Sequence, residues 1–174
     1  ALGWYTTVYY SDGKGGGTGT YGSIKWNYST PTRTPDWNAT IANNQASTTG
    51  SKGILRNSVN NQWTYGAISK FNYQLSKTLN FTVGGDWRTA EIDHFREVRD
   101  LLGGEYYRNL NPNKTPRSDF WTSEQANRKL GEKIDYHFTN TVDWLGAFGQ
   151  GEYSGGPVTA YSMAGYSMIK YGYT

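Results

Sequence analysis

The sequence contains no cysteine, and this absence excludes disulfide bonds and thiolate metal sites. It has only two histidines, with no HExxH or similar spacing, so we expect no bound metal. The 17 basic and 14 acidic residues are scattered, and without a block of lysine or arginine we expect no nucleic-acid partner. The glycine run near residue 15 lacks the Gly-Lys-Ser/Thr of a P-loop, and no other cofactor motif is present.

Long hydrophobic runs are also missing. No stretch approaches the roughly 20 apolar residues of a membrane-spanning helix, and the mean hydropathy is -0.75. Membrane-spanning strands remain possible, because each needs only about 10 residues, half of which face a polar lumen.

Aromatic residues and glycine are abundant instead. The 174 residues include 15 Tyr, 7 Trp and 22 Gly, whereas hydrophobic residues make up only 36% of the chain. Such a chain is rich in turns and aromatic strands and poor in the aliphatic residues of a helical core. We therefore predict an all-β fold.

The clearest pattern lies in the stretch NYQLSKTLNFTVGGDWR, residues 72–88. Two alternating runs flank a short polar break at residues 76–78. In the second run Leu79, Phe81, Val83 and Trp87 share one parity, with polar residues between them. This period of two predicts a hairpin with one apolar face.

Similar patterns predict five strands in total, separated by connections of two kinds. The expected strands are residues 2–11, 54–75, 79–92, 141–153 and 158–171. The breaks at 76–78 and 154–157 are short, whereas the connections at about 12–55 and 93–140 are long. This alternation is typical of outer-membrane barrels, with short periplasmic turns and long extracellular loops.

The first long connection should contain local structure. Residues 11–23 are so rich in glycine that we expect a loop or a hairpin tip. Residues 24–28 are expected to pair locally, and Asp36 should act as the N-cap of one or two helical turns.

The second long connection should begin with a helix. Residues 94–104 predict a short one, because Phe95, Val98, Leu101 and Leu102 are spaced for one helical face. Residues 105–140 are polar and predict a long loop. The pairs Asp93/His94 and Asp135/His137 are then expected to be solvated loop residues.

Aromatic spacing agrees with a membrane-spanning strand. Trp63 and Tyr73 share a parity, and at a strand tilt of about 40° they would lie roughly 25 Å apart along the membrane normal. The two aromatic girdles of an outer-membrane barrel have about this separation.

Four segments together resemble the barrel of TonB-dependent outer-membrane receptors, most closely those of Bacteroidota. They are ILRNSVNNQWTYG, NYQLSKTLNFTVGGDWR, HFREVRDLLGGEYY and VDWLGAFGQGEYSGGPVTAYSMAGYSMIKYGY. The resemblance implies a barrel of about 22 strands closed by an N-terminal plug, of which residues 1–174 would supply about five strands. Because the sequence shows no signal peptide, TonB box or plug, we expect an internal fragment of such a receptor rather than an enzyme.

The resemblance also implies a location and partners. The protein would lie in the bacterial outer membrane and contact its lipid, the plug of its own full-length chain and a TonB-type energy-transducing protein. Its ligand would be a scarce, bulky extracellular molecule, whether a ferric siderophore, cobalamin or an oligosaccharide.

Two sets of residues are candidates for functional roles in such a receptor. The ligand-binding candidates, expected on extracellular loops, are Trp37, Arg56, Tyr106, Tyr107 and Trp121. The lumen-facing candidates are Lys70, Asn72, Asp86, Arg88, Gln150 and Glu152. The parity of residues 142–153 is ambiguous, and the cost of a charge in lipid favours an inward Glu152.

Two other classes of protein stay open. Residues 9–29 resemble the N-terminal strands of small jelly-roll xylanases, for which Glu105 and Glu152 would be the two catalytic carboxylates. A soluble glycan-binding β-sandwich would instead use exposed aromatic residues to stack on sugar rings.

Overall fold

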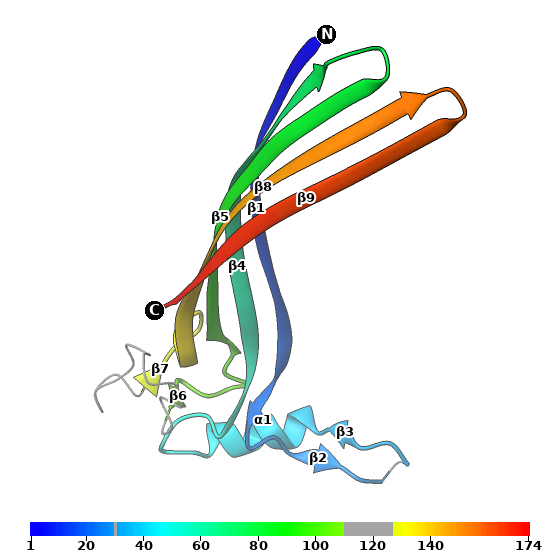
Figure 1. Cartoon of the computed structure of the whole chain (residues 1–174). Helices are drawn as coiled ribbons and strands as arrows, with labels where there is room; N and C mark the ends of the chain where they lie inside the picture. The colour runs from blue at the N-terminus through cyan, green and yellow to red at the C-terminus, as the bar shows by residue number, and fades with distance from the viewer. Residues whose placement is uncertain (30, 110–126) are drawn as a thin grey trace. The chain divides into compact units, whose positions relative to one another are not determined.

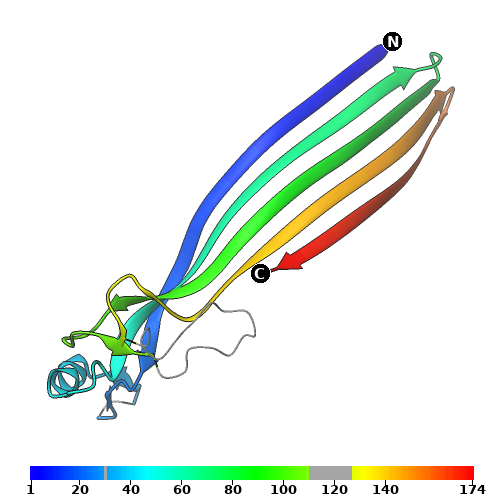
Figure 2. The ribbon, with the colours of Figure 1, turned by 90° about the vertical axis from the view of Figure 1, so that its left-hand side faces the viewer.

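A computed structural model describes residues 1–29, 31–109 and 127–174 and has a single large β-sheet (Figures 1 and 2). Its long strands are β1 (Leu2–Gly22), β4 (Gly53–Gln74), β5 (Leu79–Asp100), β8 (Lys133–Gly155) and β9 (Val158–Tyr173). They lie side by side in the order β1-β4-β5-β8-β9, so each strand pairs with the next long strand along the chain. The all-β prediction is confirmed.

Backbone hydrogen bonds at the strand ends show the antiparallel pairing. The amide of Gln74 donates to Ala1 O at 2.9 Å, and Ser23 N donates to Lys52 O at 2.7 Å, which closes both ends of the β1/β4 pair. The β8/β9 pair runs from Asn140 opposite Tyr173 to Gly155 opposite Val158. The short connections predicted at 76–78 and 154–157 are confirmed as turns at 75–78 and 156–157.

Small elements lie between the long strands. Strand β2 (Trp26–Asn27) pairs with β3 (Thr34–Pro35), and β6 (Tyr107–Arg108) pairs with β7 (Asn127–Arg128), both antiparallel. The local pairing predicted for residues 24–28 is therefore confirmed.

The one helix of the described chain is α1 (Trp37–Gln45). It begins as predicted at Asp36, whose Oδ1 accepts a hydrogen bond from Ala39 N at 2.9 Å. The described residues contain no helix long and apolar enough to cross a membrane.

The chain divides into two compact units. The first unit comprises residues 1–13, 62–92 and 140–173, and the second comprises residues 14–61, 93–139 and 174. The first unit consists of sections of β1, β4, β5 and β8, the whole of β9 and the two short turns. The second unit contains the other sections of four of these strands, together with α1 and the short strand pairs.

A hydrophobic core lies within the second unit. Its buried members are Ile54, Val98, Leu101 and Ile134, with Tyr21 and Tyr107 packed against them. Ile54 and Ile134 are fully inaccessible to solvent. Burying a side chain of this size stabilises a fold by about 1.5 to 3 kcal/mol relative to leaving it exposed.

Asn44 of α1 ties the helix to the strands around this core. Its Nδ2 donates to Gly53 O at 2.8 Å, Leu101 O at 3.2 Å and Leu102 O at 3.0 Å, and its Oδ1 accepts from Lys52 N at 2.8 Å. The Asn44 side chain is 1% exposed, and these bonds satisfy both ends of its amide.

The prediction of a glycine-rich loop at residues 11–23 is wrong, because β1 continues to Gly22. Two of its glycines allow a close approach of the neighbouring strand. A Cβ on Gly16 or Gly22 would collide with the carbonyl oxygen of Ser58 or Lys52 in or just before β4. Glycine in a strand can mark such an approach as well as a break.

The prediction of a helix at residues 94–104 is also wrong, because β5 continues to Asp100. Phe95 and Val98 are both buried although they are three residues apart, so strict strand alternation is broken between them. In the neighbouring strand Asp135 has a φ of 65°, a conformation found at β-bulges. A strand with interrupted alternation can therefore imitate the helical spacing.

The long connections are consequently shorter than predicted. They run from 23 to 52 and from 101 to 132, because β4 begins at Gly53 and β8 already begins at Lys133. Asp93, His94, Asp135 and His137 all belong to strands rather than to a solvated loop.

Candidate functional site

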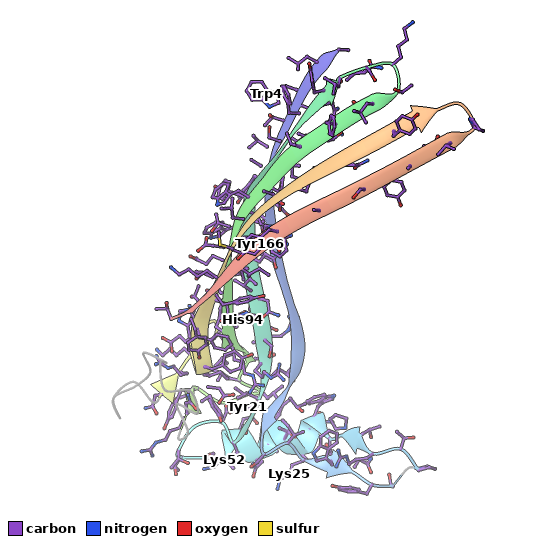
Figure 3. The ribbon with its side chains drawn as sticks, viewed as in Figure 1. Trp4, Tyr21, Lys25, Lys52, His94 and Tyr166 are labelled. Atoms are coloured by element: carbon purple, nitrogen blue, oxygen red, sulfur yellow. The ribbon has the colours of Figure 1, made fainter. Side chains whose placement is uncertain are left out.

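The sheet of the first unit has one predominantly apolar face, and side-chain contacts between β1 and β4 identify it. Trp4 Nε1 donates to Ser69 Oγ at 2.8 Å, and the hydroxyls of Thr6 and Ser69 lie 2.8 Å apart. The rings of Tyr10 and Tyr65 have centroids 4.7 Å apart. The even positions of β1 and the odd positions of β4 therefore share this face. Figure 3 shows Trp4 projecting from β1.

The same face continues across β5, β8 and β9. Thr89 Oγ1 donates to Asp143 Oδ1 at 2.7 Å, which joins the odd positions of β5 and β8. Leu145 lies opposite Met168 in the β8/β9 register. We call the residues of the five strands that share this side the apolar face. They are Leu2, Trp4, Thr6, Val8, Tyr10, Trp63, Tyr65, Ala67, Ser69, Phe71, Tyr73, Leu79, Phe81, Val83, Gly85, Trp87, Thr89, Leu145, Ala147, Gly149, Gly151, Tyr153, Val158, Ala160, Ser162, Ala164, Tyr166 and Met168.

The apolar face contains no charged side chain over the whole of this set. Each strand contributes a stretch of about 9 to 11 residues, the length that a tilted strand needs to cross a bilayer. Charges begin where the stretches end, at Asp12, Glu91, Asp143 and Lys170. Asp143 and Lys170 lie directly opposite each other on β8 and β9.

Aromatic residues lie toward both ends of the apolar face. Trp4, Tyr73 and Tyr153 are near one end of the charge-free stretches of their strands, on the side of the short turns, whereas Trp87 and Tyr166 are near the other end of these stretches. Small residues and Phe occupy much of the length between them. This distribution is typical of the interfacial aromatic girdles of membrane strands.

The opposite face of the first unit is the polar face. It contains all six residues predicted to face a lumen: Lys70, Asn72, Asp86, Arg88, Gln150 and Glu152. Thr82 Oγ1 donates to Asn72 Oδ1 at 2.9 Å, which joins the even positions of β4 and β5. The guanidinium of Arg88 lies 4.7 Å from the centre of the Trp144 ring on β8. This contact also assigns the parity that the sequence left ambiguous, with Gln150 and Glu152 on the polar face.

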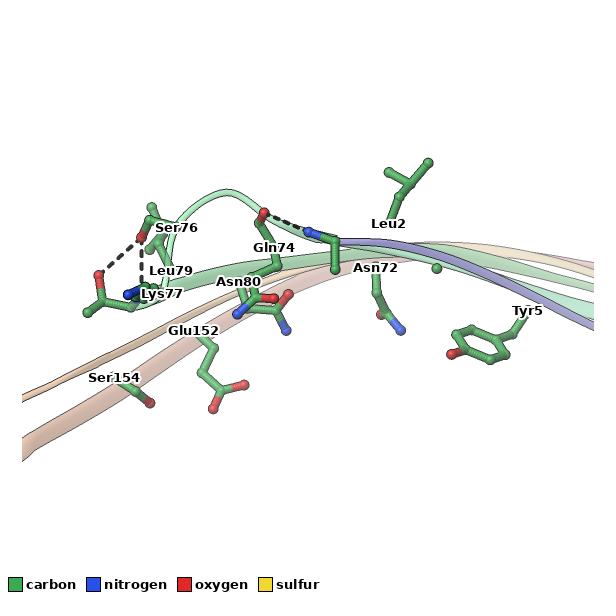
Figure 4. A pocket seen from close by; sticks show the side chains of 13 residues that line it. Leu2, Tyr5, Asn72, Gln74, Ser76, Lys77, Leu79, Asn80, Glu152 and Ser154 are labelled. Atoms are coloured by element: carbon green, nitrogen blue, oxygen red, sulfur yellow. Dashed lines mark hydrogen bonds between the residues drawn. The ribbon is translucent and has the colours of Figure 1, made fainter.

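A cavity of about 460 Å³ lies on the polar face near the turns (Figure 4). Tyr5, Asn72, Asn80 and Glu152 point to one side of the ribbon there, and Leu2 of the apolar face points to the other. Amides and hydroxyls dominate the lining. Such groups hold water or a polar partner in place.

The ligand-binding candidates occupy different settings. Trp37 is the first residue of α1 and is 41% exposed. Arg56 lies within β4 rather than on a loop, and its guanidinium donates to Ser58 Oγ. Tyr106 lies between β5 and β6, where its carbonyl accepts from Ser51 N at 2.7 Å. Trp121 lies outside the described residues.

Tyr107 is more buried than an exposed ligand-binding residue would be. Its ring meets the edge of Tyr21 at 5.9 Å between centroids and packs against the hydrophobic core. Burial, with smaller contributions from Tyr21 and Asp135, raises the pKa of Tyr107 to about 12. The hydroxyl of Tyr107 therefore stays protonated over the physiological range.

A charged network in the second unit was missed from the sequence. His137 Nε2 lies 2.8 Å from Asp93 Oδ1 and 2.8 Å from Lys133 Nζ. Arg96 forms an ion pair with Asp135, and its guanidinium lies 5.0 Å from the Tyr136 ring. Asp93 and Arg96 on β5 are 44 and 39 residues away from their partners His137 and Asp135 on β8, and the pairing of the two strands brings them together. Nowhere in residues 1–29, 31–109 and 127–174 do three or more acidic or histidine side chains gather around a possible metal position.

The two carboxylates of the xylanase alternative belong to different units. Glu105 is exposed in the connection that follows β5, in the second unit, whereas Glu152 lies in β8 in the first. In comparisons with known proteins, the chain matches no family model, no curated protein and no solved structure.

Proposed function

We propose that this chain forms part of the wall of a transmembrane β-barrel in a TonB-dependent outer-membrane receptor. Such a receptor takes up a scarce, bulky ligand with energy from a TonB-type protein. The observation that carries the proposal is the apolar face of the first unit, which is free of charge along five adjacent strands.

Lipid explains this face better than water does. Soluble monomers rarely expose contiguous apolar patches larger than a few hundred Å², yet side chains such as Val8, Val83 and Leu145 are more than half exposed here. Three polar side chains of the face, Trp4, Thr6 and Ser69, are joined by hydrogen bonds on Ser69. Polar groups in a bilayer need such internal partners.

The polar face fits the opposite environment. Within the same stretches it carries the charged residues Lys70, Asp86, Arg88 and Glu152. In the proposed barrel these side chains face a water-filled lumen and the plug. The turns at 75–78 and 156–157 lie on the periplasmic side, and the two long connections lie outside the cell.

The sheet edges support the proposal that the wall includes further strands. Among the described residues, β1 pairs only with β4 and β9 only with β8. In lipid each unpaired backbone group costs several kcal/mol, so both edges require neighbours. A soluble β-sandwich or a jelly-roll enzyme would instead cover the apolar face with a second sheet.

Cysteine labelling tests the proposal directly, because the chain has no cysteine of its own. Single cysteines at Thr82 and Glu152 should react with a membrane-impermeant maleimide in intact outer membranes. Cysteines at the adjacent positions Phe81 and Tyr153 should react only after denaturation. Thr82 and Phe81 lie at the same depth within about one residue rise of 3.3 Å, so the pair is matched.

Two results would contradict the proposal. One is equal reactivity of the neighbouring positions, whether high or low. The other is a purified chain that behaves as a soluble monomer and unfolds cooperatively in the absence of detergent or lipid.

A further inference from the structure

A cavity of about 300 Å³ in the second unit lies between the end of α1 and the connection that follows β5. Gln45 and Thr48 line one side of it, and Glu105 and Tyr106 line the other. This volume is at the lower limit of ordinary small-ligand sites.

The backbone around the cavity is held firmly. Asn44, next to Gln45, makes the buried hydrogen bonds that tie α1 to Gly53 and Leu101. Ser51 Oγ donates to Leu101 O at 2.6 Å, and Ser51 N donates to Tyr106 O at 2.7 Å. The site therefore exists without a ligand, which lowers the entropic cost of binding.

Gly50 positions the aromatic wall of the cavity. A Cβ on Gly50 would lie 2.6 Å from Cε2 of Tyr106, so only glycine lets this ring lie against the backbone. Gly50 also has a φ of 79°, which other residues rarely adopt. The ring of Tyr106 is half-buried and keeps a surface toward the cavity.

The polar groups of the cavity are neutral donors and acceptors plus one carboxylate. Gln45 supplies an amide, Thr48 a hydroxyl and Glu105 two acceptor oxygens. The described residues give the Gln45 and Glu105 side chains no hydrogen-bond partner. No lysine or arginine lines this cavity among the residues that the structure describes.

A neighbouring cavity has the opposite character. It has a volume of about 500 Å³ and is lined by Lys52 and Arg108, with the Tyr21 and Tyr107 rings. Anionic ligands would be attracted to that cavity, whereas Glu105 repels them from the Tyr106 cavity. Both cavities have tyrosine in their lining, and they differ in the sign of the charge that lines them.

We infer that the Tyr106 cavity binds a neutral saccharide. The apolar C–H face of a sugar packs on the Tyr106 ring, its hydroxyls donate to Glu105, and the Gln45 amide and Thr48 hydroxyl bond to the remaining hydroxyls. That the cavity binds a saccharide does not depend on the proposed function. That this saccharide is the ligand captured by the receptor does rest on it.

Binding of neutral and anionic oligosaccharides to the full chain in detergent provides the test. Neutral oligosaccharides should bind, and Tyr106→Ala and Glu105→Ala should each weaken their binding about tenfold or more. Tyr106→Phe should keep the affinity because it keeps the ring. The matched controls Tyr28→Ala, at an exposed ring in the same unit, and Lys52→Ala, in the basic cavity, should leave it unchanged.

Three outcomes would overturn the inference. The first is that no neutral saccharide binds, and the second is that Tyr106→Ala binds the saccharide as well as the unchanged chain does. The third is that only anionic ligands bind and that Lys52→Ala abolishes their binding. The amide protection of Ile54 and Val98 in hydrogen exchange reports whether each variant keeps its core. Saccharide binding tests this inference and cysteine labelling tests the receptor proposal, so either can be refuted without the other. Equal labelling of both faces would refute the receptor proposal even where the saccharide still binds.

Discussion

The two units of this chain place their large apolar side chains in opposite ways. The buried hydrophobic residues of the described chain all belong to the second unit: Ile54, Phe95, Val98, Leu101, Leu102 and Ile134. Of the exposed large hydrophobic side chains in residues 1–29, 31–109 and 127–174, only Tyr28, Trp37 and Leu130 belong to the second unit, and the rest lie on the first. The second unit has a hydrophobic core, whereas the first unit is a sheet with an apolar face and a polar face.

This difference shows what each unit requires from its surroundings. The second unit can bury apolar area against itself, and the hydrophobic effect in water then stabilises it. The first unit has its hydrogen-bonded sheet but no interior, so its apolar face gains nothing in water until another phase or partner covers it. A substitution in the core of the second unit should therefore change stability in water, whereas a substitution on the apolar face of the first unit should change stability in a bilayer.

The largest effect is expected at the core of the second unit. Ile54→Ala leaves a cavity at a fully buried position and should lower the free energy of unfolding by about 2 to 5 kcal/mol. Leu130→Ala is the control, because Leu130 is 62% exposed and its truncation should have little effect. Thermal unfolding of the protein in detergent measures both. Equal effects would mean that this core does not stabilise the unit.

A charge on the apolar face tests the first unit. Val83→Arg should reduce the stability of the membrane-inserted protein by about 2 to 4 kcal/mol, as expected for a charge near the bilayer midplane. Thr82→Arg puts the same charge on the adjacent residue of the polar face and should cost far less. Folding into lipid vesicles from urea, followed by tryptophan fluorescence, compares the two variants. Equal losses would remove the distinction between the faces.

The smallest effect concerns alkaline pH and sharpens the comparison within the second unit. The folded-state pKa of Tyr107, about 12, exceeds the ordinary value of 10.0. Between these values the unfolded chain releases a proton that the folded chain retains, so the free energy of unfolding falls as the pH rises. The stabilisation by the neutral hydroxyl is complete below about pH 10.

Tyr107→Phe should make unfolding less sensitive to pH in this window, and denaturant titrations at several pH values measure the change. Tyr28→Phe, at an exposed ring, is the control. A pH dependence that is the same in both variants would assign the alkaline loss to other groups.

Local signals in the sequence predicted the elements that depend on neighbouring residues. Asp36 begins α1 because its carboxylate caps the first turn, and this interaction needs only three following residues. The alternation around Leu79 and Phe81 fixed the hairpin and its two faces for the same reason. The six lumen candidates lie on one face because strand parity follows directly from residue number.

The errors arose where a distant strand determines the outcome. Gly16 and Gly22 belong to a strand because β4 approaches their backbone closely, and nothing near them in sequence reveals β4. Phe95 and Val98 have helical spacing, yet they belong to β5, which pairs with β8. The network of Asp93 with Lys133 and His137 was hidden likewise, because Asp93 on β5 meets the other two only across the pairing with β8.

The hydroxyl contacts on the apolar face have an evolutionary consequence. Ser69 on β4 bonds to both Trp4 and Thr6 on β1, so the loss of Ser69 leaves the Trp4 indole N–H and the Thr6 hydroxyl without this partner. Ser69→Ala alone should therefore be selected against, whereas its combination with apolar residues at positions 4 and 6 should be tolerated. Among related chains these three positions should change together, as a single inherited unit.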